Sequence, residues 1–104
     1  MDWDDVEEGV LLKDRDVLPS GARYDIFVRR VRGEELFPSG FKYRLYYGFP
    51  DNDAPVLLYD NGHRGGDHHR HVDGELDDDY EFPGMESLYQ RFLDEVRHYE
   101  QHSP

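Results

Sequence analysis

The segment 63–71, His-Arg-Gly-Gly-Asp-His-His-Arg-His, concentrates the side chains of this sequence that could do chemistry. It contains four of the six histidines, together with two arginines and two glycines. Histidine changes its charge near neutral pH, so it serves as a general acid, a general base or a metal ligand. The segment follows the apolar run 56–59, and a polar loop at the end of a strand often carries binding and catalytic groups. We expect the chemistry of this chain to lie here, against the simpler alternative of a solvated His-rich loop.

Metal binding is one chemistry that this segment could support. His69 and His71 are two positions apart, so in an extended segment both imidazoles point the same way. Nitrogen and oxygen ligands together suit a borderline divalent metal. Three further side chains are near enough in sequence to complete such a site: Asp60, His63 and Asp67.

Acid–base catalysis without a metal is the second possibility, and protein recognition is the third. Cleavage of RNA by its own 2′-hydroxyl needs a base, an acid and a cation for the charge that develops on the phosphate. Two of the histidines could supply the base and the acid, Arg64 or Arg70 the cation, and Tyr59 a further hydrogen-bond donor. The loop could instead be only a recognition surface for a partner protein. The spacing of the histidines does not choose between these possibilities.

Length and composition favour one globular domain in a reducing compartment. The chain has 104 residues, with no cysteine and no apolar stretch that approaches the roughly 20 residues of a membrane span. We expect residues 1–8 to be a disordered acidic leader and residues 9–102 to form one domain. The absence of cysteine and of a signal peptide indicates a cytoplasmic protein without a membrane partner.

The charge of the chain is strongly negative but unevenly distributed. The net charge is −12, with 15 Asp against 9 Glu and only two lysines among the 12 basic residues. This combination is typical of adaptation to a salt-rich cytoplasm, where salt screens the self-repulsion, and it suggests a halophilic source. Residues 13–44 nevertheless carry eight basic and five acidic side chains.

Hydrophobic periodicity predicts a small α+β fold. Alternation indicates strands over 22–32 and 41–49, and shorter extended segments are expected at 10–18, 56–59 and 80–82. Apolar residues at helical spacing over 85–99 predict a terminal amphipathic helix. We therefore expect an antiparallel β-meander of four to five strands with one C-terminal helix packed on one face.

The sheet face opposite this helix would be basic and aromatic. If strands 22–32 and 41–49 are neighbours, their outward positions bring four basic side chains together with two aromatic rings. Phosphate contacts and base stacking make such a surface suitable for single-stranded nucleic acid. A solvated sheet face whose arginines pair with the many carboxylates would have the same residue pattern. The side chains concerned are Arg23, Arg29, Lys42 and Arg44, with Phe27 and Tyr46.

Three motifs, in this order, resemble the TumE-type toxins of prokaryotic toxin–antitoxin systems. They are Lys-Tyr-Arg-Leu-Tyr-Tyr at 42–47, Leu-Tyr-Asp-Asn at 58–61 and Gly-Asp-His-His-Arg-His-Val-Asp-Gly at 66–74. A helix entered through Phe82 and Ser87-Leu88 follows, and the resemblance spans about residues 10–100. It implies a toxin encoded beside a small helix-turn-helix antitoxin. The motif positions are Tyr59, Asp60, Asn61, His68, His69 and His71.

Residues and resemblance together predict a toxin that acts on RNA through the His-rich segment, in the manner of a metal-independent ribonuclease. The expected catalytic residues are His68, His69, His71, Arg70, Tyr59 and Asp60. The expected substrate-binding residues are Asn61, His63, Arg64, Arg29, Lys42, Arg44 and Tyr46. No cofactor or bound metal is expected. The alternatives are a non-catalytic module that pairs with a helix-turn-helix antitoxin or regulator and, ranked lower, a His-ligated metal protein.

Overall fold

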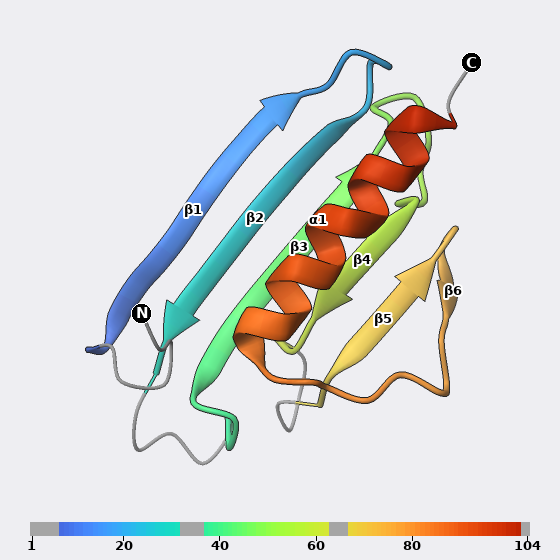
Figure 1. Cartoon of the computed structure of the whole chain (residues 1–104). Coiled ribbons are helices and arrows are strands. Elements are labelled where there is room, and N and C mark those ends of the chain that lie inside the picture. Colours follow the sequence, from blue (N-terminus) through green and yellow to red (C-terminus); the bar gives the residue numbers. More distant parts are fainter. Residues whose placement is uncertain (1–6, 32–36, 63–66, 103–104) are drawn as a thin grey trace.

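The chain folds into one antiparallel sheet with one helix across it (Figure 1). The computed structural model describes residues 7–31, 37–62 and 67–102. Each strand pairs with the next in sequence, in the order β1-β2-β3-β4-β5-β6. The elements are β1 (Gly9–Val17), β2 (Arg23–Arg30), β3 (Phe41–Gly48), β4 (Leu57–Asp60), β5 (His69–Val72), β6 (Glu75–Leu76) and α1 (Met85–Gln101).

The predicted α+β class is confirmed, and the meander has six strands where four to five were expected. The additional strands are β5, which lies in the segment interpreted as a polar loop, and β6, which follows it; residues 69–72 pair with β4 on one side and with β6 on the other. Asp73 and Gly74 join β5 to β6 with φ values of 52° and 82°. Asp-Gly is the residue pair that favours such a tight hairpin turn. Segment 80–82 is not a strand, and its rings pack against neighbouring side chains instead.

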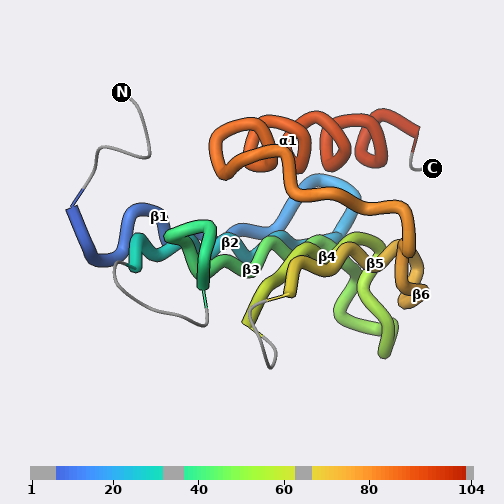
Figure 2. The backbone as a smooth tube through the Cα atoms, turned by 90° about the horizontal axis from the view of Figure 1, so that it is seen from below, coloured from blue at the N-terminus to red at the C-terminus, as the bar shows by residue number. Residues whose placement is uncertain are grey.

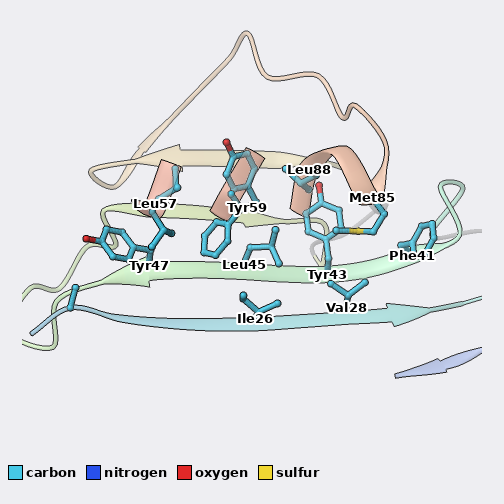
Figure 3. Packing of buried hydrophobic residues seen from close by; sticks show 13 residues of the cluster. Ile26, Val28, Phe41, Tyr43, Leu45, Tyr47, Leu57, Tyr59, Met85 and Leu88 are labelled. Carbon is cyan, nitrogen blue, oxygen red and sulfur yellow. The ribbon is translucent and has the colours of Figure 1, made fainter. Parts of the chain in front are cut away.

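The core lies between the helix and one face of the sheet, as Figure 3 shows. Alternate residues of β3 point into it, so that Tyr43, Leu45 and Tyr47 are all at most 1% exposed. The helix contributes Leu88 and Phe92, which are both fully buried. Burial of these apolar surfaces is the main stabilising contribution to the fold. The alternation predicted for 41–49 and the apolar face predicted for 85–99 are therefore both confirmed.

The other face of the sheet carries neither a helix nor a second sheet among the residues that the structure describes (Figure 2). The helix forms one layer and the six-stranded sheet forms the other. Because β-strand side chains alternate between faces, every second residue of each strand points away from the helix. We call this surface the open face.

Candidate functional site

The pairing of β4 with β5 divides the predicted catalytic residues between the two faces of the sheet. Tyr59 pairs with Arg70 and Asp60 pairs with His69. Neighbouring residues of a strand point to opposite faces, so Tyr59 and Arg70 lie on the helix side, whereas Asp60 and His69 lie on the open face. The six predicted catalytic side chains therefore do not converge on one centre.

Arg70 is held by three hydrogen bonds on the helix side. Its Nε donates to the Tyr59 hydroxyl at 2.8 Å, its Nη1 to Asp77 at 2.8 Å and its Nη2 to Glu95 of α1 at 2.6 Å. The Tyr59 hydroxyl donates in turn to Glu95. This group, which we call the helix-side clamp, fastens β4 and β5 to the helix. It occupies all three guanidinium nitrogens of Arg70, so the cation predicted for a phosphate is engaged within the fold.

Protonation in the helix-side clamp is fixed at physiological pH. Burial, followed by the hydrogen bond to Glu95, raises the pKa of Tyr59, so its phenol remains a donor. Burial alone would lower the pKa of Arg70, but its hydrogen bonds to Glu95, Tyr59 and Asp77 raise it overall. The hydrogen bond from Arg70 lowers the pKa of Asp77. The Tyr59 phenol and the Arg70 guanidinium therefore keep their protons and the Asp77 carboxyl stays ionised, unlike a pair poised to exchange protons near pH 7.

His68 also lies on the helix side, where aromatic rings enclose it. Its ring stacks on Phe82 with centroids 4.1 Å apart, and its Nδ1 lies 2.8 Å from the Tyr43 hydroxyl. Burial lowers the pKa of His68, with Asp67 opposing the shift. His68 thus connects the beginning of β5 to β3 and to the segment that leads into α1.

Asn61 is completely buried and is bound to the backbone of β3. Its Oδ1 accepts a hydrogen bond from the Tyr43 amide at 2.9 Å, and its Nδ2 donates to the Phe41 carbonyl at 2.7 Å. A side-chain amide that replaces strand hydrogen bonds satisfies backbone groups that would otherwise be buried without partners. The structure thus places this predicted substrate-binding residue in the sheet rather than on its surface.

The open face brings together the other motif residues. Arg44 of β3 pairs with Asp60 of β4, and Asp60 pairs with His69 of β5, so the three side chains form one row across the sheet. His69 Nδ1 lies 3.9 Å from Asp60 Oδ1. The rings of His69 and His71 are neighbours, with centroids 6.3 Å apart. Three separate segments of the sequence, each carrying part of the motif set, therefore meet at one place.

A hollow of about 460 Å³ adjoins this row, and we call it the site hollow. Lys42 and Arg44 line it beside Asp60, and the Phe27 ring forms another part of its wall. Two cations, the two carboxylates Asp25 and Asp60 and one aromatic ring are thus within reach of a ligand that also contacts His69.

The open face is basic although the chain is acidic overall. Arg29 pairs with Lys42, Phe27 with Arg44, and Asp25 with Tyr46, which confirms that the predicted basic and aromatic residues share this face. Six basic strand residues lie here, namely Lys13, Arg15, Arg23, Arg29, Lys42 and Arg44, against two acidic ones, Asp25 and Asp60. Such a surface attracts anions.

Two of the predicted site residues, His63 and Arg64, lie outside the described residues. Within 7–31, 37–62 and 67–102, no group of three or more His, Asp or Glu side chains is arranged to hold a metal ion. His69, His71 and Asp60 share a face, but they do not form such a group.

The sequence pattern did not predict the contacts that Tyr59 and His68 make with distant segments of the chain. Glu95 meets Tyr59 from 36 positions away, and Phe82 stacks on His68 across the β5–β6 hairpin. No local pattern reports such contacts. By contrast, the separation of Tyr59 from Asp60 follows from strand alternation, which was a signal available in the sequence.

The environment of His68 predicts a specific dependence of stability on pH. The folded-state pKa of His68 is below its ordinary value, so below about pH 6.5 the unfolded chain binds more protons than the folded one. The contribution of His68 to the free energy of unfolding is therefore fully present above that pH and is lost as the pH falls towards the folded-state pKa. We expect the wild-type Tm to fall more than that of His68→Phe between pH 7.5 and 5.5, measured by circular dichroism. An equal fall in both proteins would contradict the assignment.

Comparison with known proteins identifies the family of this chain. The family described as Toxin TumE matches residues 6–100, which is nearly the whole chain. No curated protein matches the chain, and no solved structure matches it either. In the part that the structure describes, no helix is long and apolar enough to cross a membrane. The chain belongs to the TumE toxin family, and is thus the toxin of a toxin–antitoxin system with a cognate antitoxin.

Proposed function

We propose that this toxin acts on RNA and that the open face is its RNA-binding and catalytic surface. The observation that carries the proposal is the row Arg44–Asp60–His69, with His71 beside it. The register of β3, β4 and β5 brings these residues together from three motif segments. Imidazoles suit proton transfer, and arginine suits a phosphate. Together these groups match the requirements of RNA cleavage by the 2′-hydroxyl.

The proposed reaction uses His69 and His71 as the acid–base pair. One imidazole removes the proton of the 2′-hydroxyl, whose oxygen attacks the neighbouring phosphorus. The bond to the 5′-oxygen breaks, and the other imidazolium protonates this leaving oxygen. The products are a 2′,3′-cyclic phosphate and a 5′-hydroxyl. Arg44 and Lys42 stabilise the negative charge on the phosphate during this step, and Asp60 orients His69.

The rest of the open face supports RNA binding. Arg23 and Arg29 extend the basic surface along β2, where they can neutralise further phosphates. Phe27 and Tyr46 provide rings on which bases can stack. On the other side of the sheet, we assign Tyr59, Arg70 and His68 positioning roles, because their polar atoms are engaged within the fold.

Removal of both imidazoles tests the catalytic part of the proposal. We expect the His69→Ala/His71→Ala double variant to cleave single-stranded RNA at least about 100-fold more slowly, because both proton transfers lose their catalyst. Cleavage is measured by gel electrophoresis, and the cyclic phosphate product by mass spectrometry. His98→Ala, an exposed change on α1, is the matched control and should retain wild-type rates.

Toxicity on expression gives the complementary result. Growth arrest should disappear in the double variant while its circular dichroism spectrum stays that of the wild type. Undiminished toxicity in that variant would reject catalysis and would instead favour a non-catalytic toxin that works by binding.

We further propose that the antitoxin is a helix-turn-helix DNA-binding protein and that it docks on the helix side. An apolar groove of about 610 Å³ lies there between α1 and the β1–β2 turn, with Leu18, Leu93 and Val96 in its lining. Glu100 and Arg97 are the charged residues of its lining, and Asp14 and Asp16 project from the helix side of the neighbouring strand β1. An amphipathic segment with basic flanks, such as a DNA-binding protein can offer, complements this groove, whereas a second copy of the acidic chain does not.

A substitution in this groove tests antitoxin docking separately from RNA cleavage. We expect Leu93→Arg to weaken antitoxin binding at least about tenfold by placing a charge among apolar contacts, while RNA cleavage is unchanged. Gln90→Arg, an exposed change on the same helix, should bind normally. Binding is measured by calorimetry with the purified antitoxin. Wild-type affinity in Leu93→Arg, or dimerisation of the chain through the groove, would contradict this docking site.

A further inference from the structure

A second hollow lies beside the site hollow on the open face. It has a volume of about 640 Å³ and is lined in part by Arg15, Arg23 and Tyr46. The two hollows share two lining residues, Asp25 and Arg44. This volume lies within the range of small-ligand sites. A ligand that fills both hollows must therefore pass Arg44, the residue that is proposed to hold a phosphate.

The ring of Tyr46 lines this second hollow and lies against Gly48. A Cβ atom added at Gly48 would lie 2.7 Å from the Tyr46 hydroxyl oxygen and 3.0 Å from Cζ, so the end of the ring lies close over Gly48. The guanidinium of Arg44 lies 5.3 Å from the centroid of the same ring. A half-buried aromatic ring that is held in this way, beside a cation, is suited to stacking with a nucleobase.

Two carboxylates, Asp16 and Asp25, line this otherwise basic hollow, and of the two it is Asp25 that lies on the open face. It lies directly opposite Tyr46 on the neighbouring strand and opposite Arg15 on the other side. A carboxylate repels phosphates and so weakens general RNA binding. A role for Asp25 in ligand binding must therefore come from the hydrogen bonds that it accepts. Its two oxygens can accept two parallel hydrogen bonds. Among the four RNA bases, guanine alone offers two adjacent N–H donors on one edge, from N1 and from the N2 amino group.

We propose that the second hollow binds a guanine base of the RNA. The base stacks on Tyr46, the Asp25 carboxylate accepts its N1 and N2 hydrogens, and Arg44 contacts the adjoining phosphate. Tyr46 and His71 lie in one row two strands apart, or about 10 Å. The bound guanosine is therefore close in sequence to the phosphate at the imidazole pair. This inference rests on the proposed action on RNA and adds base specificity to it.

Fluorescence anisotropy with short uncleavable RNA tests the inference independently of catalysis. The probes are 2′-O-methyl oligonucleotides of uridine that carry guanosine, inosine or adenosine at one internal position. Inosine lacks only the N2 amino group. We expect the wild type to bind the guanosine probe about tenfold more tightly than either of the others. Asp25→Asn should lose this preference, whereas Asp51→Asn, an exposed carboxylate in a turn, should keep it.

The variants of the stacking ring provide a second measurement. Tyr46→Ala and Gly48→Ala should each weaken binding of the guanosine probe about tenfold, while Tyr46→Phe should not. Equal affinity of the wild type for all three probes, or a guanosine preference that persists in Asp25→Asn, would overturn the inference and leave the proposed action on RNA intact. Failure of every probe to bind would overturn both.

Discussion

The structure depends most on the register between β4 and β5. Asp60 lies opposite His69, and Tyr59 lies opposite Arg70. Because side chains alternate along a strand, a slip by one residue would exchange the two faces of β5. The imidazoles of His69 and His71 would then face the helix, and Arg70 would face solvent. The open-face row exists only in the observed register.

The helix-side clamp is well suited to fix this register. Arg70 contacts Tyr59 and Asp77, and it contacts the helix through Glu95. The positive charges of Arg70 and of Arg91, which lies 3.4 Å from Glu95, are balanced by the two carboxylates. Removal of one member would leave a partly buried charge without its partner, which is more costly than the gain from forming the pair. The clamp on the helix side thus helps to fix the positions of the side chains on the open face, where we place the chemistry.

The sequence predicted those features that depend on short-range pattern. Alternation assigned Lys42, Arg44 and Tyr46 to one face, and helical spacing identified Leu88 and Phe92 as buried. The prediction of a loop over the histidines was wrong for 69–72, because polar and imidazole side chains have little strand preference and tertiary pairing decides such cases. The Asp-Gly turn after this strand was a usable signal. The roles of Asn61 and Arg70 could not be predicted, since their partners come from elsewhere in the fold.

The most direct test of the central claim is to find which side of the sheet RNA contacts. Selective labelling of aromatic rings allows NMR signals to be followed as uncleavable single-stranded RNA is added. Phe27 and Tyr46 report on the open face, and Tyr89 and Tyr99 report on the helix side. We expect the signals of Phe27 and Tyr46 to shift and those of Tyr89 and Tyr99 to stay in place. Shifts confined to Tyr89 and Tyr99 would contradict an RNA site on the open face.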